Sequence, residues 1–252
     1  MLRSIKALTG YSIIATDGEI GEVSEFYFDD QTWTIRYLIA DTGNWLMSRL
    51  VLISPEALGK PDWDNKKFPV SLTKKQVEES PEISRDKPVS KQQEFDLTNY
   101  YGWPYYWTGM SGGLPGAMPY PAAMEASTSR DLRDNSSENK GDPHLRSTKE
   151  IEGYNIKAND GEIGDVDDFI VDDETWTIRY MIVDTNKWLP GGRKVLISLH
   201  WIKDINWLES EVVVDLDKDS IKGSPEYDSD SALNRQYEGK LFEHYSKKRY
   251  WE

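Results

Sequence analysis

Three histidines are the residues of this sequence most often associated with proton transfer or zinc binding. His144, His200 and His244 are widely separated along the chain, and the sequence contains no cysteine. Neither the arrangement of a Ser/His/Asp triad nor the ligand spacing of a zinc site can be recognised around them. We therefore interpret the histidines as solvated or packing residues, and we predict no catalytic residues and no enzymatic activity.

Adjacent aspartates form a second group with chemical potential. Asp29–Asp30 and Asp172–Asp173 lie between strand-like segments, and Asp165, Asp167 and Asp168 precede the second pair. Carboxylate oxygens could bind Ca²⁺, but the spacing of an EF-hand loop is missing. Aspartate is also common in hairpin loops because its side chain bonds to nearby backbone N–H groups. The turn interpretation is favoured, so we predict no metal and no cofactor.

Arg36 and Arg179 stand in the middle of apolar, strand-like segments. A guanidinium in such a place either pairs with a carboxylate, for which Asp41 and Asp184 are candidates, or recognises a partner. The ion pair is the favoured interpretation, and both arginines remain candidate partner-binding residues.

Two aromatic segments are the other candidates for partner binding. Tyrosine and tryptophan are enriched where proteins bind one another, but aromatic side chains also pack within a fold. Both alternatives stay open at this stage. The residues concerned are Trp103, Tyr105, Tyr106, Trp107, Tyr250 and Trp251.

The composition indicates a globular, acidic protein. The 252 residues carry a formal net charge of −14, and 38% of them are hydrophobic. Such a charge disfavours nucleic acids and anionic membrane surfaces, and favours a basic protein partner. No stretch has the length and apolar character of a signal peptide or of a membrane-spanning helix. We expect a cytoplasmic protein without direct membrane insertion.

The sequence contains a long internal repeat. Gly10–Leu46 aligns without gaps on Gly153–Leu189, an offset of 143, and about two thirds of the positions are identical. After a one-residue insertion the offset becomes 144, and the alignment continues to Trp107 and Trp251. Repetition over this length indicates two copies of one structural unit.

The repeat predicts a division into three parts. We place the first module at residues 1–107 and the second at residues 151–252, each ending in a helical and aromatic tail. Residues 108–150 are rich in Gly, Pro, Ser and charge, which is typical of a flexible linker.

Turn signals and alternation within each module predict short strands. Asp17–Gly18 suits a tight hairpin turn, and residues 29–32 read as a hairpin loop. Trp33, Ile35, Tyr37 and Ile39 alternate with other residues and are predicted to share one face of a strand. Apolar spacings of three and four residues predict a helix over 231–247, with a counterpart over 90–101. Five or six strands per module would form a small β-barrel.

These segments resemble the PRC-barrel domain, a family that includes the cytoplasmic part of the photosynthetic reaction-centre H subunit. The resemblance rests on four segments, and all of them recur in the second copy except that Leu199 replaces Pro55. They are Asp17-Gly-Glu-Ile-Gly21, Val23-x-x-Phe26, the Trp33-Thr-Ile-Arg-Tyr37 strand ending at Asp41, and Val51-Leu-Ile-Ser-Pro55.

The resemblance implies a mainly β fold of two small antiparallel barrels in tandem. It also implies a non-catalytic adaptor for protein interaction and assembly, with a protein partner of unknown identity. The barrels would pack on each other within the chain or in a homodimer. An alternative is a component like the H subunit that assists electron or proton transfer at a membrane complex.

Overall fold

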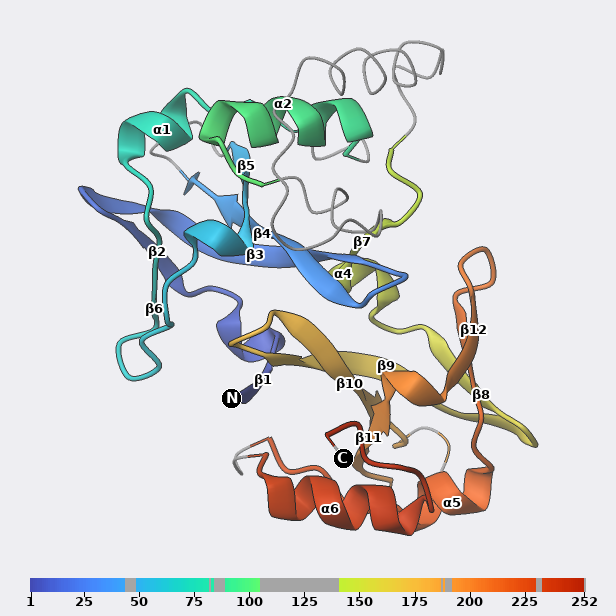
Figure 1. The fold of residues 1–252 in the computed structure, drawn as a ribbon. Helices are drawn as coiled ribbons and strands as arrows, with labels where there is room; N and C mark the ends of the chain where they lie inside the picture. Colours follow the sequence, from blue (N-terminus) through green and yellow to red (C-terminus); the bar gives the residue numbers. More distant parts are fainter. Residues whose placement is uncertain are drawn as a thin grey trace, which may run out of the picture.

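The computed structural model describes residues 1–43, 49–81, 83, 89–104, 141–186, 188, 192–229 and 233–251. The first repeat forms a set of short strands followed by a tail helix (Figure 1). Its elements are β1 (Leu2–Ser4), η1 (Lys6–Leu8), β2 (Ser12–Ala15), β3 (Gly18–Asp29), β4 (Thr34–Asp41), β5 (Leu50–Ile53), η3 (Pro55–Ala57), β6 (Lys67–Pro69), α1 (Lys74–Glu78) and α2 (Lys91–Tyr101).

The second repeat forms nearly the same series of elements. It has one additional strand, β12, and ends in its own tail helix. Its elements are β7 (Leu145–Ser147), α4 (Thr148–Ile151), β8 (Asn155–Ala158), β9 (Gly161–Asp172), β10 (Thr177–Asp184), β11 (Lys194–Ser198), η5 (Leu199–Trp201), β12 (Ile202–Asn206), β13 (Glu211–Val214), α5 (Lys218–Gly223) and α6 (Arg235–His244).

The strands pair in the order β12-β13-β8-β9-β10-β4-β3-β2-β6, with β1, β5, β7 and β11 attached to the side of this path. The prediction of a mainly β fold is therefore confirmed. The expectation of purely antiparallel pairing is wrong at both ends, where β2–β6 and β8–β13 are parallel. In each repeat the chain crosses the unit between the two paired strands. As a result, β6 runs in the same direction as β2, and β13 runs in the same direction as β8.

The repeats meet along β4 and β10, at one antiparallel contact between Thr34 and Thr177. These two threonines occupy the same position in the repeat. The flanking backbone hydrogen bonds are 2.7 and 2.8 Å long and run in opposite directions. The two halves are therefore related by a pseudo-twofold axis at this contact.

Beside this contact, one tryptophan of each repeat packs against aromatic residues of the other repeat. Trp176 lies 6.1 Å from Phe26 and 5.9 Å from Phe68, and Trp33 lies 6.2 Å from Phe169, measured between ring centroids. Both tryptophans have a positive φ, 55° for Trp33 and 52° for Trp176. A bulky residue rarely adopts this conformation, and the aromatic packing offsets its cost.

The amino-terminal strand of each repeat is exchanged with the other repeat. Strand β1 pairs with β9, and β7 pairs with β3. The hydroxyl of Ser4 donates to the carboxylate of Asp168, and in the equivalent position Ser147 donates to Glu25. Each sheet is thus completed by a strand from the partner repeat.

The exchanged strand corrects the predicted boundary of the second module. We placed the start at residue 151, with 108–150 as linker, but β7 and most of α4 lie before that residue. Leu-Arg-Ser stands at both 2–4 and 145–147, which is a sequence signal that our alignment missed. Residues 108–140 of the predicted linker lie outside the described residues.

A β-bulge changes which side chains share a face of β4. The register against β3 shifts between Ile35 and Tyr37, so Arg36 has no residue opposite it. Ile35 packs in the core shared by both repeats, whereas Tyr37 and Ile39 pack in a second cluster beneath α2. The prediction that Trp33, Ile35, Tyr37 and Ile39 share one face is therefore wrong, because Trp33 and Ile35 pack against the shared core.

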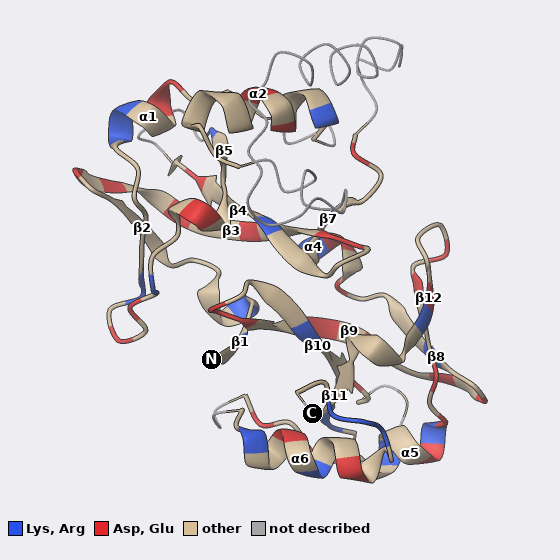
Figure 2. Ribbon diagram, viewed as in Figure 1, with Lys and Arg blue, Asp and Glu red and all other residues tan. Residues whose placement is uncertain are grey.

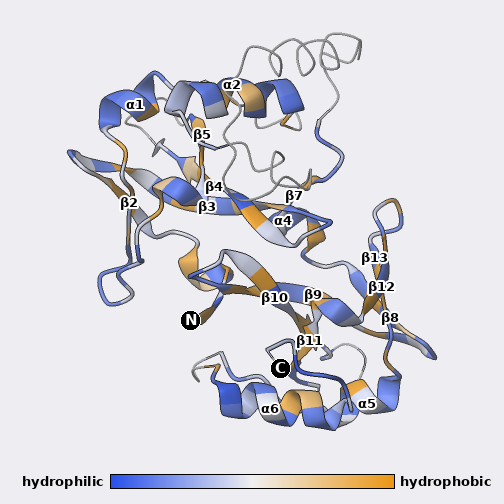
Figure 3. Ribbon diagram, in the orientation of Figure 1, coloured by the Kyte–Doolittle hydropathy of each residue, from blue (hydrophilic) through white to orange (hydrophobic). Residues whose placement is uncertain are grey.

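The tail helices α2 and α6 cover the two outer sides of the structure, so the layers run helix, sheet, sheet, helix (Figure 1). Apolar residues concentrate on the strands, and the helices are largely hydrophilic apart from short apolar segments (Figure 3). The helix predicted over 231–247 is shorter because Asn234 caps it, accepting the N–H of Tyr237 at 3.0 Å. No helix in the described ranges is long and apolar enough to cross a membrane.

Candidate binding groove

A groove with a volume of about 660 Å³ lies where the first repeat meets the hairpin loop of the second. One wall is the start of β4, and the opposite side is the loop before β10. The remaining walls are η3 with the residues that follow it and the end of α2. The groove is lined by residues 34–37, 54–56, 58–60, 98, 103–104 and 173–176.

Arg36 lies in the wall of the groove, at the bulge of β4. Its Nη2 atom is 3.3 Å from Asp29 Oδ2 and 3.2 Å from Thr32 Oγ1. Burial would raise the pKa of Asp29, but hydrogen bonds from Thr32 and Gln31 and the charge of Arg36 hold that pKa below its usual range. Arg36 is therefore fixed by an ion pair.

The ion pairs of both arginines differ from the predicted ones. We expected Asp41 and Asp184 as partners, but Arg36 pairs with Asp29, and Arg179 pairs with Asp172 at 3.7 Å. The partners precede the arginines in sequence, across the hairpin. The hairpin places the end of one strand beside the start of the next, and the bulge turns the arginine toward that end.

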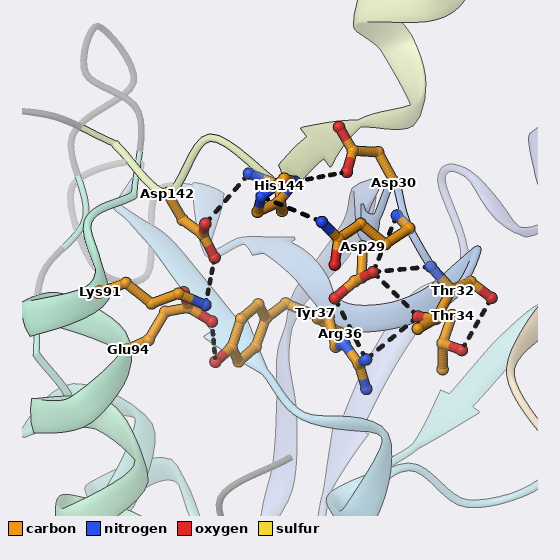
Figure 4. Close-up of polar contacts among 11 residues, drawn as sticks. Asp29, Asp30, Thr32, Thr34, Arg36, Tyr37, Lys91, Glu94, Asp142 and His144 are labelled. Carbon is orange, nitrogen blue, oxygen red and sulfur yellow. Dashed lines mark hydrogen bonds and ion pairs between the residues drawn. The ribbon is translucent and has the colours of Figure 1, made fainter. Parts of the chain in front are cut away.

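A buried glutamate joins the tail helix α2 to the strand that carries Arg36 (Figure 4). Glu94 is fully buried, and its Oε2 atom accepts the phenol proton of Tyr37 at 3.0 Å. Burial and the carboxylate of Glu94 raise the pKa of Tyr37. Because a charge buried in this way is stable only with donors around it, this contact fixes the position of α2 over the sheet.

Asp142, which precedes the exchanged strand β7, extends this cluster. Its carboxylate pairs with Lys91, which also lies 3.5 Å from Glu94, and its N–H donates to Val89 O at 2.8 Å. Burial would raise the pKa of Asp142, but the ammonium of Lys91 and the N–H of His144 lower it. The segment before β7 is thereby tied to the base of α2.

His144 lies in the same region, with its side chain exposed. Its Nδ1 atom is 2.9 Å from Asp30 Oδ1, and its Nε2 atom is 3.2 Å from the amide of Gln31 (Figure 4). Its carbonyl oxygen accepts the N–H of Asp30 at 2.9 Å. His144 therefore belongs to the contact between β7 and the first hairpin loop.

In the second repeat the equivalent site is filled by the aromatic end of the chain. Glu238 takes the place of Glu94 and accepts hydrogen bonds from Tyr180 at 2.7 Å and from Tyr250 at 2.8 Å. The guanidinium of Arg179 lies 5.0 Å from the centre of the Tyr250 ring. The aromatic tail of the second repeat thus packs on its own tail helix and sheet.

Two substitutions between the repeats distinguish the groove from the filled site. At an offset of 144, Ala57 and Thr98 of the first repeat align with Trp201 and Phe242 of the second. The Trp201 and Phe242 rings are 5.2 Å apart, and Trp251 lies 5.3 Å from Phe242. The first repeat carries a small side chain at both positions: Thr98 lines the groove, whereas Ala57 is buried in the core.

The structure brings only part of the predicted partner-binding set to the groove. Arg36 and Trp103 line it, and Trp103 also stacks on Tyr101 at 4.1 Å. Arg179, Tyr250 and Trp251 lie together at the filled site. Three further candidates, Tyr105, Tyr106 and Trp107, lie outside the described residues.

Sequence reasoning missed the two buried glutamates. Glu94 and Glu238 were aligned as repeated positions, but their burial could not be read from helical spacing. Each faces a tyrosine that recurs in the repeat, Tyr37 or Tyr180. A sequence signal for this contact was available, because both the tyrosine and the glutamate recur in the two repeats.

The sequence matches the PRC-barrel domain family twice, over residues 2–76 and over residues 145–221. The two matches cover more than half of the chain, so the chain belongs to the PRC-barrel domain family. The second match begins at the first residue of β7, in agreement with the exchanged strand. No curated protein matches the sequence.

Proposed function

We propose that this protein is a non-catalytic assembly module that binds a protein partner in the groove at the junction of its repeats. The observation that carries the proposal is the difference between the two equivalent sites. The second site is filled by Tyr250 and Trp251, whereas described residues of both repeats line a groove of about 660 Å³ at the first. Tyr106 and Trp107, the equivalents of Tyr250 and Trp251, lie outside the described residues. A concave site of this volume is within the usual range for ligand binding.

The groove depends on the pairing of the repeats. The loop of residues 173–176 comes from the second repeat, and the exchanged strands and the Thr34–Thr177 contact hold it against the first. Sites formed between two units are common places for ligands. Fusion of the two repeats in one chain keeps the two walls together at any protein concentration.

The polar groups of the groove support binding rather than catalysis. Among the described lining residues, the hydroxyl of Ser54 accepts the N–H of Glu56 at the start of η3, which is a capping role. Arg36 is engaged by Asp29 and Thr32. These contacts hold the wall of the groove in place, and none of them activates a nucleophile.

Site-specific photo-cross-linking in the native cell tests the proposal. A benzoylphenylalanine at position 60, on the rim of the groove, is compared with one at position 204, the equivalent place beside the filled site; Lys60 and Asp204 are both exposed. We expect a discrete cross-linked protein from position 60 that disappears in Thr98→Phe. Equal labelling from both positions, or labelling that survives Thr98→Phe, would show that the groove is not the binding surface.

A further inference from the structure

The filled site in the second repeat shows which side chains this kind of surface accepts. The Tyr250 hydroxyl donates to the buried carboxylate of Glu238, and the rings of Tyr250 and Trp251 pack against Phe242. Arg235 adds a guanidinium 4.6 Å from the Trp251 ring. A buried acceptor, cations beside the rings and an apolar floor together recognise a Tyr-Trp segment.

The groove retains the polar half of this arrangement at the matching positions. Arg36, Tyr37 and Glu94 correspond to Arg179, Tyr180 and Glu238, and each tyrosine donates to its glutamate. The first repeat lacks two aromatic rings of the filled site, because the positions of Trp201 and Phe242 carry much smaller side chains. A ligand that restores the packing must therefore supply large apolar rings of its own.

The charge on the rim indicates what flanks those rings. Glu56, Asp173 and Glu174 line the groove together with Lys60 and Arg36, and the whole chain carries a net charge of −14. Arg36 is paired with Asp29, and Asp173 contacts the N-terminal amino group. In the filled site the three residues before Tyr250 are Lys247, Lys248 and Arg249, which form the basic stretch near the C-terminus in Figure 2. Of these, Lys247 pairs with an aspartate at 3.1 Å. Basic residues beside an aromatic pair suit an acidic surface.

From these observations, and resting on the proposed function, we infer that the groove binds a peptide segment of a partner protein in which basic residues precede a Tyr or Trp. The aromatic side chain occupies the groove beside Thr98. The basic residues lie along the rim formed by Glu56 and the loop of the second repeat. The second repeat carries a segment of this type in its own chain.

The test uses a fluorescein-labelled peptide with the sequence Lys-Lys-Arg-Tyr-Trp-Glu, which is that of residues 247–252, titrated with the full-length protein. We expect saturable binding by fluorescence anisotropy, and no binding of Lys-Lys-Arg-Ala-Ala-Glu. Thr98→Phe, which installs the residue of the filled site, weakens binding at least tenfold, and the conservative Thr98→Ser retains it.

Thermal unfolding of each variant shows whether it remains folded. Binding that is equal for both peptides, or that Thr98→Phe leaves unchanged, overturns the inference. Tyr106 and Trp107 align with Tyr250 and Trp251, so the titration is repeated with both replaced by alanine. Equal affinity in the two proteins supports a partner as occupant, whereas binding only after these replacements assigns the groove to the chain's own segment.

The two proposals fail separately. If cross-linking from position 60 captures a protein that depends on Thr98 but the peptide does not compete, the assembly function stands and the aromatic ligand is wrong. If no protein is captured while the peptide binds with the expected dependence, the groove recognises aromatic segments but its role in assembly is wrong.

Discussion

Replacing Asp168 by asparagine is expected to stabilise the protein at neutral pH, by an amount that decreases as the pH falls. Asp168 lies on β9 beneath the exchanged strand β1 and is only 3% exposed. Its carboxyl accepts the hydroxyl of Ser4 and the backbone N–H groups of Lys6 at 3.1 Å and Phe169 at 2.7 Å. Burial outweighs these hydrogen bonds and raises the pKa of Asp168 to about 6.

The size and sign of the effect follow from this pKa. A rise from the ordinary 3.8 to about 6 corresponds to about 3 kcal/mol of preference for the protonated form in the folded state. Stability from a raised pKa is fully present below the unfolded value and is lost as the pH rises through the folded value. Relative to low pH, the raised pKa of Asp168 therefore lowers the stability of the fold by about 3 kcal/mol at pH 7.5, and by about 1 kcal/mol at pH 4.5, where only the unfolded chain is largely ionised at this residue.

Asparagine reproduces the protonated acid at this position. Its amide oxygen can accept the two backbone N–H groups, and its NH₂ group can donate to the hydroxyl of Ser4. Urea unfolding of Asp168→Asn and the unchanged protein at pH 4.5 and 7.5 measures the difference. We expect the variant to gain about 2 kcal/mol more at pH 7.5 than at pH 4.5.

The comparison between pH 4.5 and pH 7.5 avoids the lower pH range in which three other aspartates change the stability of the fold. Asp29, Asp142 and Asp167 have lowered pKa values, so the stability that they contribute is present above about 3.8 and is lost only at lower pH. Glu25→Gln serves as the matched control, because Glu25 makes the equivalent contact to the other exchanged strand but is less buried. An Asp168→Asn variant that is less stable at pH 7.5, or whose effect is the same at both pH values, would refute this reasoning.

Three further substitutions test packing and backbone geometry by urea unfolding. Tyr180→Phe removes a donor from the buried carboxylate of Glu238 and should destabilise by about 1.5–3 kcal/mol; an unchanged midpoint would argue against that contact. Trp176→Ala empties the ring position inserted into the first repeat and should destabilise by about 3–5 kcal/mol, with separate unfolding of the two repeats as the contrary result. Gly21→Ala places a Cβ 2.1 Å from a carbonyl oxygen of β4, whereas Gly10→Ala meets open space and adds only the cost of its positive φ, about 1 kcal/mol. Equal losses in the two glycine variants would contradict the close approach.

Local signals in the sequence predicted the elements of the fold well. The turn at Asp17–Gly18 and the hairpin loop at residues 29–32 lie between strands as expected, since turns are encoded by a few adjacent residues. The helix predicted over 90–101 is α2. The parallel pairs were not predictable in this way, because strand direction depends on how distant segments cross.

The candidate site was predicted only in part. Arg36 and Trp103 were chosen from their residue types, and both line the groove. Glu94 and Asp142 looked like ordinary members of an acidic surface, because burial of a carboxylate depends on the segments that close over it. Thr98 also carried no signal, since a small residue marks a groove only when its surroundings are known.

The internal repeat was determined by the sequence alone, and with it the presence of two similar β units, because similarity between segments requires no knowledge of their contacts. Tertiary structure decided that the units exchange their first strands and share one core. A three-residue strand has no periodicity of its own, so its partner is selected by long-range hydrogen bonds. The groove is likewise a tertiary property: it forms because η3, the end of α2 and the loop of residues 173–176 meet there, with Thr98 on one wall where the second repeat places the ring of Phe242.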